Sequence, residues 1–240
     1  MQVNILGVKI DDVAIPQIVD QVKEWLASQG ETLSAQKHYI VTPNPEIVMM
    51  AQKDPKLKEI IKKADLAIPD GVGLKLSGDI ECTSPGIDTM EALVSLAAEK
   101  GVATGFLGGE EGVAKKTAEC LQKKYKNLKV VFAESGGEVD KEGKLLKSPK
   151  ELKLLKCDLL FVAFGPPKQE KWIFDNLQKI PVKVAMGVGG SFDLISGKIP
   201  RAPVLIRKLG FEWLFRLIMQ PWRIKRQLAL IKYVLLLIIR

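Results

Sequence analysis

Short apolar and β-branched runs alternate with segments of helical periodicity along most of the chain. The runs predict strands at Val3–Leu6, Tyr39–Thr42, Leu66–Ile68, Thr104–Leu107, Lys129–Phe132, Leu159–Phe164 and Lys183–Val188. The periodic segments predict helices near 15–28, 46–63, 89–100, 111–125, 148–155, 168–178 and 203–218. Strands that alternate with helices pair in parallel through helical crossovers. The sequence therefore predicts an α/β fold, a mostly parallel sheet with helices on both faces.

Five predicted strands are followed at once by turn-rich polar sequence. These segments are Thr42–Glu46, Pro69–Gly73, Gly108–Glu110, Gly165–Gln169 and Gly187–Asp193. In open parallel sheets the ligand crevice lies beyond the carboxyl ends of the strands. We therefore expect these segments to line one shared crevice. The stretch from Gly136 to Lys144 is predicted to be a loop.

Basic charge divides the chain near Pro200. All six arginines lie between Arg201 and Arg240, where nine basic residues face Glu212 alone, whereas residues 1–200 balance 27 lysines with 27 acidic side chains. Arginine binds phosphate oxygens in pairs and is desolvated more easily than lysine. We predict a core of residues 1–200 and a helical appendage of residues 201–240 that meets phosphates.

The predicted appendage is as apolar as it is basic. Proline breaks a helix interior, so we expect two helices with a bend at Gln220-Pro221. The run Leu228–Ile239 is shorter than the roughly 20 apolar residues that a spanning helix needs. An amphipathic helix with basic and aromatic residues is typical of binding at a membrane surface. We see no secretion signal, and three scattered cysteines favour reduced thiols in the cytosol.

Asp70 follows a predicted strand and is flanked by Gly71 and Gly73. A carboxylate in this position can be approached closely by a ligand and can act as a general base. The alternative is a plain Asp-Gly turn; we favour catalysis.

Two helix starts next to predicted strands also carry polar groups. Asn44 before Pro45 is a good N-cap, and the same helix start, with Thr42 beside it, suits an anion or sugar hydroxyls. Lys168 and Gln169 are expected to project into the crevice, with a functional role for Gln169. Trp172 is expected in the core.

The segment Gly187–Asp193 contains three glycines that permit close backbone approach, followed by Ser191 and Asp193. It can hold a nucleoside ring against Gly189, and a helix cap at Ser191 is an equal alternative. Elsewhere, the glycines of Gly105–Gly112 do not have the dinucleotide-binding spacing, which disfavours a nicotinamide-dependent dehydrogenase.

No Asp-x-Asp sequence occurs in the chain, so we expect neither a metal clamp for a diphosphate nor another cofactor. His38 has no second histidine or cysteine nearby, so we do not expect it to bind a metal ion. Arg216, Arg223 and Arg226 can supply the missing positive charge. The alternative for these arginines is a solvated or lipid-headgroup face. Asp88 is expected to be a helix cap with Glu91.

Six motifs in register closely resemble the WecG/TagA/CpsF glycosyltransferase family from end to end. They are Thr42-Pro-Asn-Pro-Glu, Pro69-Asp-Gly-Val-Gly, Gly165-Pro-Pro-Lys-Gln-Glu-Lys-Trp, Gly187-Val-Gly-Gly-Ser-Phe-Asp, Arg201-Ala-Pro, and Glu212-Trp-Leu-Phe-Arg with Pro221-Trp-Arg. The resemblance implies a Rossmann-like fold with a C-terminal appendage. It also implies inverting, metal-independent transfer from a UDP-sugar, typically UDP-N-acetylmannosamine, to a polyprenyl-diphosphate-linked sugar on the cytoplasmic membrane face. Such transfer serves teichoic acid, common antigen or capsule assembly.

The family's site residues carry over onto matching positions. The resemblance implies that Asp70 is the catalytic base, that Thr42, Asn44 and Gln169 belong to the pocket, and that the three appendage arginines hold the diphosphate. Two positions depart from the family pattern: Cys82–Pro85 replaces an arginine before Gly86-Ile-Asp88, and the usual aromatic near Gly136 is missing.

The sequence thus predicts an inverting glycosyltransferase that is peripheral on the cytoplasmic face of the membrane. Its partners are a UDP-sugar, a polyprenyl-diphosphate-linked acceptor and the inner membrane surface, with self-association through the apolar tail as a possibility. A nucleic-acid-binding protein that uses its basic tail is the alternative from another class. We expect no nucleic-acid partner, since RNA binders expose stacking aromatics beside basic patches.

Overall fold

The computed structural model describes residues 1–27, 36–147 and 156–239, and the predicted helix at 148–155 lies outside these ranges. The strands are β1 (Gln2–Ile5), β2 (Val8–Asp11), β3 (His38–Val41), β4 (Leu66–Ala67), β5 (Thr104–Gly108), β6 (Val130–Glu134), β7 (Glu138–Val139), β8 (Leu145–Lys147), β9 (Leu159–Ala163) and β10 (Val184–Gly187). The α-helices are α1 (Ile15–Ala27), α2 (Pro45–Ala51), α3 (Pro55–Lys63), α4 (Gly86–Lys100), α5 (Val113–Lys124), α6 (Lys168–Asn176), α7 (Ser191–Ile195), α8 (Val204–Lys208), α9 (Glu212–Met219) and α10 (Ile224–Ile239). Short 3₁₀ turns form η1 (Val72–Ser77), η3 (Leu177–Lys179) and η4 (Pro221–Arg223).

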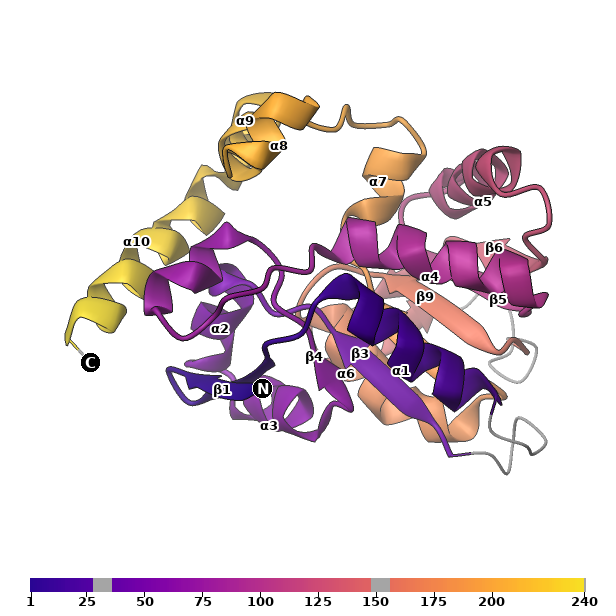
Figure 1. Ribbon diagram of the computed structural model, residues 1–240, viewed down its shortest axis with the longest axis horizontal. Helices are drawn as coiled ribbons and strands as arrows, with labels where there is room; N and C mark the ends of the chain where they lie inside the picture. Colours follow the sequence, from indigo (N-terminus) through magenta and orange to yellow (C-terminus); the bar gives the residue numbers. More distant parts are fainter. Residues whose placement is uncertain (28–35, 148–155, 240) are drawn as a thin grey trace.

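A six-stranded sheet in the order β4-β3-β10-β9-β5-β6 forms the centre of the fold, and all of its pairings are parallel. Successive side chains of a strand point to opposite faces. In β9, Leu160 and Val162 accordingly join one buried cluster, and Leu159 and Phe161 join the other. Helices α2, α3, α6 and α10 cover the first face, and α1, α4 and α5 cover the second (Figure 1). The predicted α/β fold with a parallel sheet is confirmed.

The first predicted strand takes a different place from the one expected. β1 pairs with β2 in a separate antiparallel hairpin, so it is not part of the parallel sheet. Leu6 and Gly7 turn the chain with positive φ values of 50° and 75°. Two such residues in succession form the tight turn that suits a two-residue hairpin.

Two helices that were predicted as continuous are each broken into two. Residues 46–63 form α2 and α3, because Asp54 caps α3 by accepting from Leu57 N at 3.0 Å and Pro55 begins it. Residues 203–218 form α8 and α9, separated at Gly210, whose φ of 77° interrupts the helical backbone. The predicted loop at 136–144 is also wrong in part, because β7 and β8 pair as a small hairpin.

The last helix, α10, is docked on the body of the protein. The predicted bend at Gln220-Pro221 is confirmed by η4, and α10 then packs against α2 and η1 (Figure 1). Tyr233 of α10 is fully buried in the cluster that covers the first face of the sheet. The boundary near residue 200 stays a prediction. Within the described ranges, every helix is too short or too polar to cross a bilayer.

Tyr233 provides a test of how firmly α10 is attached. We expect Tyr233→Ala to lower the free energy of unfolding by roughly 3–5 kcal/mol, the usual cost of removing a buried aromatic ring. Tyr233→Phe is the matched control. Its free energy of unfolding should be equal or higher, because the Tyr233 hydroxyl is buried and has no hydrogen-bond partner among the described residues. Chemical denaturation of both variants measures the difference; equal stabilities would show that α10 is not anchored by this ring.

Candidate active site

A large cleft of about 1730 Å³ opens at the carboxyl ends of the central strands. Of the nine predicted site residues, seven line it: Thr42, Asn44, Asp70, Gln169, Gly189, Asp193 and Arg216. The side chains of Arg223 and Arg226 lie outside the described part of the structure, so their roles stay predictions. The strand-end segments that the sequence singled out therefore share one crevice, as a parallel sheet requires.

Asp70 lines this cleft and is separated from the end of β4 by Ile68 and Pro69. Its Oδ1 accepts a hydrogen bond from Gly86 N at 3.2 Å, and its carboxyl also bonds to the Asn44 side chain. Burial raises the pKa of Asp70 to about 6, and the nearby Glu212 carboxylate acts in the same direction. The Gly86 amide, the positive charge of Arg216 and the Asn44 side chain oppose this rise in the pKa. Such a carboxyl is ionised at neutral pH yet basic enough to take a proton.

Asn44 combines the two roles that the sequence left open. Its Oδ1 accepts from Ile47 N at 3.0 Å and so caps α2, with Pro45 in the first helical position. The same side chain reaches Asp70. The neighbouring Thr42 donates from its hydroxyl to the Gly187 carbonyl at 3.2 Å and is buried beneath the cleft. Thr42 thus ties the end of β3 to the end of β10.

Gln169 joins α6 to the glycine segment after β10. Its amide oxygen accepts from Gly189 N at 2.9 Å, and the side chain is almost fully buried although it borders the cleft. Gly189 has a φ of 51°, a conformation that glycine adopts without strain. Asp193, farther along this segment, lies 3.6 Å from Lys198 Nζ, and Lys198 also pairs with Glu110 at 2.6 Å. Ser191 donates to Val188 O at 2.7 Å at the start of α7.

Arg216 reaches into the cleft from α9. A Cβ atom at Gly190 would collide with the Arg216 guanidinium, so this side chain lies directly against the glycine segment. Its charge also acts on Asp70. The appendage thus places a cation between the carboxylate and the backbone of Gly190. A guanidinium in that place can bind the oxygens of a phosphate.

Arg201 holds α9 against the core. Its Nη2 donates to Asp88 at 2.6 Å, and its Nε lies 3.8 Å from Glu212, the first residue of α9. The expectation that Asp88 caps α4 with Glu91 is wrong: Asp88 lies inside the first turn of α4 and pairs with Arg201, while Glu91 pairs with Lys124. From the sequence, Arg201 was recognisable only as part of the Arg201-Ala-Pro motif.

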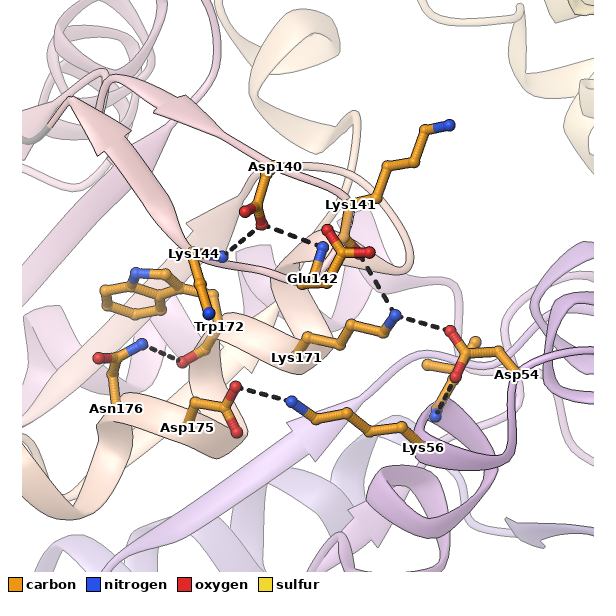
Figure 2. Close-up of polar contacts among 11 residues, drawn as sticks. Asp54, Lys56, Asp140, Lys141, Glu142, Lys144, Lys171, Trp172, Asp175 and Asn176 are labelled. Atoms are coloured by element: carbon orange, nitrogen blue, oxygen red, sulfur yellow. Dashed lines mark hydrogen bonds and ion pairs between the residues drawn. The ribbon is translucent and has the colours of Figure 1, made fainter.

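The β7–β8 hairpin forms a further wall of the cleft and is fastened to α6. Lys168 borders the cleft as expected. Its Nζ donates to Val139 O at 2.6 Å, so its ammonium group binds the hairpin. Lys171 pairs with Asp54 at 2.7 Å and donates to Lys141 O at 3.3 Å (Figure 2). Asp140 closes the hairpin turn by accepting from Glu142 N and Lys144 N (Figure 2). The Asp140-x-x-Gly143 sequence was the available signal for this turn.

Gly143 explains why the hairpin can lie so close to α6. A Cβ atom there would lie 2.9 Å from Trp172 N, and its φ is 84°. Both facts favour glycine. Trp172 itself is fully buried in the core, as expected. Thr83, within the segment Cys82–Pro85 that departs from the motif pattern, also borders the cleft.

Known proteins are similar to this chain over nearly all of its length. The model of the Glycosyl transferase WecG/TagA/CpsF family matches residues 3–240. An N-acetylglucosaminyldiphosphoundecaprenol N-acetyl-beta-D-mannosaminyltransferase of Staphylococcus aureus strain MW2 is 35% identical over 230 residues, which cover 94% of this chain and 87% of the relative. The protein of the same description from strain MRSA252 is 34% identical over the same shares of the two chains.

The protein is therefore a glycosyltransferase, an α/β enzyme whose cleft lies at the carboxyl end of a parallel sheet. It belongs to the WecG/TagA/CpsF family, which confirms the resemblance seen in its motifs. Neither the interpretation of the tail as a nucleic-acid-binding element nor the dehydrogenase alternative is favoured by these comparisons.

Proposed function

We propose that this chain transfers N-acetylmannosamine or a related hexose from a UDP-sugar to a polyprenyl-diphosphate-linked N-acetylglucosamine. The relatives named above are described as N-acetylmannosaminyltransferases that act on N-acetylglucosaminyldiphosphoundecaprenol. The observation that carries the proposal is the presence of a half-buried carboxylate, Asp70, and a guanidinium that acts on it, Arg216, in one cleft. Transfer to this acceptor would serve cell-surface polysaccharide assembly, teichoic acid in particular.

The proposed reaction is a single displacement with inversion at the anomeric carbon. Asp70 accepts the proton of the acceptor hydroxyl as the hydroxyl oxygen attacks the anomeric carbon of the donor. The bond between that carbon and the UDP oxygen breaks, and the electron pair leaves with UDP. Arg216, together with Arg223 and Arg226, neutralises the diphosphate, and Thr42, Asn44, Gln169, Gly189 and Asp193 hold the substrates. We propose that no metal ion is required, since arginine side chains supply the charge.

Turnover assays with defined substrates test this function. A panel of UDP-sugars is incubated with a short-chain polyprenyl-diphosphate-N-acetylglucosamine acceptor, and UDP release is measured. We expect acceptor-dependent release with UDP-N-acetylmannosamine or a related sugar, and the same rate with a chelator present. Failure of every UDP-sugar to give acceptor-dependent release would overturn the proposal, and a rate abolished by the chelator would remove metal independence from it.

We also propose that the appendage binds the cytoplasmic surface of the membrane. Large apolar side chains are exposed along α8, α9, η4 and α10, among them Leu205, Trp213, Trp222, Leu235 and Ile238. Arg207 and Lys208 lie beside them on α8. Exposed apolar groups with basic neighbours are typical of binding at a lipid interface. Self-association through the same surface stays a prediction.

Vesicle binding gives a measurable consequence. The double variant Leu205→Ser/Trp222→Ser should co-sediment with anionic vesicles at least about tenfold less than the unchanged protein, because both exposed side chains lose their apolar area. Val131→Ser is the matched control: Val131 is exposed on β6, away from the appendage, and its loss should not change co-sedimentation. Equal binding by all three proteins would contradict the membrane role of these two residues.

A further inference from the structure

Glu170 is a buried acid that the mechanism above does not use. It is the third residue of α6 after the Pro167 cap, it follows Gln169 directly, and its side chain is about 1% exposed. It does not border the cleft. A carboxyl removed from water is costly unless it gains hydrogen bonds or gives up its charge. Its place next to Gln169 therefore requires an explanation.

Only one of the two carboxyl oxygens of Glu170 is hydrogen-bonded within the described structure. One carboxyl oxygen, Oε1, accepts from Gln169 Nε2 at 2.9 Å. The other, Oε2, is buried and has no hydrogen-bond partner among the described residues. Burial raises the pKa of Glu170 to about 7, and the bond from Gln169 opposes that rise. The acid thus adds little to the hydrogen bonding of the core beyond its contact with Gln169.

Two partners determine the orientation of the Gln169 amide. Gly189 N can only donate, so the amide atom 2.9 Å from it must be the oxygen. The nitrogen then faces the Glu170 carboxyl, which accepts from it. A flipped amide would place its NH₂ group against Gly189 N–H and its oxygen against the carboxyl, and both contacts would be lost.

Close packing also restricts this amide. A Cβ atom at Gly187 would lie 2.9 Å from Gln169 Nε2, so the side chain rests on the backbone at the end of β10. Gln169 borders the cleft. Its Nε2 has two hydrogens, of which one is donated to Glu170, and its Oε1 has two lone pairs, of which one accepts from Gly189 N. A correctly oriented amide can offer the second hydrogen and the second lone pair to a substrate.

We propose that Glu170 is a positioning residue: its carboxyl holds the Gln169 amide in the one orientation that both supports Gly189 and presents a fixed donor and acceptor to the substrate in the cleft. This inference deepens the proposed function and rests on it for the identity of the substrate. A preorganised polar group binds more tightly because it loses less freedom on binding.

The test compares Glu170→Met with Glu170→Gln in the full chain. Methionine keeps the length of the side chain but cannot hold the amide, so kcat/KM for the UDP-sugar should fall roughly tenfold, the scale of one hydrogen bond to a charged group. Glutamine keeps an acceptor oxygen and should retain most of the activity. The melting temperature of Glu170→Met should be equal or higher, because a buried unpaired oxygen is removed. A role limited to folding predicts the opposite change in the melting temperature.

A double variant separates positioning from a direct effect. In a Gln169→Ala background, Glu170→Met should cause no further loss of kcat/KM, because the side chain that it orients is gone. An additional tenfold loss would overturn the proposal. Asp175→Asn is the control on the same helix: its ion pair with Lys56, at 2.9 Å (Figure 2), joins two residues that do not line the cleft, and kcat/KM should be unchanged.

Hydrogen exchange tests the same inference without any turnover. In Glu170→Met, the peptide that contains residues 187–193 should exchange faster, because Gly189 N–H loses its fixed acceptor, while α1 and α4 keep their exchange rates. Unchanged exchange in that peptide, or faster exchange throughout the protein, would overturn positioning by Glu170. Absence of turnover in the unchanged protein would instead overturn the proposed function and leave this measurement decisive for Glu170.

Discussion

Asp70→Asn is expected to lower kcat by roughly 10²-fold or more, since general-base catalysis contributes on that scale. Asparagine has nearly the same shape and can still accept from Gly86 N, so substrate binding should change little. The measurement is kcat and KM for acceptor-dependent UDP release. Asp20→Asn, which changes an exposed carboxylate of α1, is the control and should behave as the unchanged protein. Normal turnover of the Asp70 variant would remove Asp70 from the role of base.

The pKa of Asp70 gives this prediction a pH profile. With a pKa of about 6, the carboxyl is protonated and inactive as a base at lower pH. We expect kcat/KM to fall tenfold per pH unit below about 6, and the fall to be absent from whatever activity Asp70→Asn retains. A profile that stays flat down to pH 4.5 would show that ionisation of Asp70 does not limit the reaction.

As the pH rises through the pKa of Asp70, folding stability should fall while activity rises. The folded-state pKa of Asp70 is raised above its ordinary value of 3.8, so the folded protein holds this proton more tightly than the unfolded chain does. Folding stability is therefore lost as pH rises from about 4 to about 6, and the loss is complete above that range. Asp70→Asn has no such charge and should melt at a higher temperature at pH 8. This measurement also shows that lost turnover is not lost folding.

Arg216→Ala is expected to have the second large effect. The guanidinium lies against Gly190 and acts on Asp70, so its removal takes away the positive charge that we propose neutralises the departing diphosphate. Removing one such stabilising group typically costs about 10²–10³-fold in kcat. Arg216→Lys should recover only part of this loss, because an ammonium cannot bind two phosphate oxygens in the planar arrangement of arginine.

Two further expected results separate a direct role of Arg216 at the diphosphate from a general effect of positive charge. Lys232→Ala removes an exposed cation from α10 and should leave kcat unchanged. Removal of Arg216 should also move the acid limb of the pH profile to higher pH, because the pKa of Asp70 rises when its positive neighbour is lost. If Arg216→Ala and Lys232→Ala had equal activity, Arg216 would have no direct part in catalysis.

Periodicity was sufficient to predict the layers of this protein. A strand buried on both faces reads as a continuous apolar run, as in Leu159–Ala163, and such runs appear in the sequence without any knowledge of contacts. The elements that were missed or misjudged depend on single residues that change the backbone direction. Asp54-Pro55 and Gly210 each break a helix whose apolar periodicity continues past the break. The strands β7 and β8 are too short to show alternation, so only the turn residues Asp140 and Gly143 could have indicated that hairpin.

The amino-acid sequence by itself determined the fold class, the crevice segments, the family and the chemical types of the site residues, because these depend on local patterns and motifs. Only the tertiary structure decided which groups meet. Arg216 lies against Gly190, and Arg201 lies between Asp88 and Glu212, although these residues are separated along the chain. The fold also turns the side chains of the neighbours Gln169 and Glu170 toward each other. The raised pKa of Asp70 also arises there, because burial is a property of the packed molecule and not of any one segment.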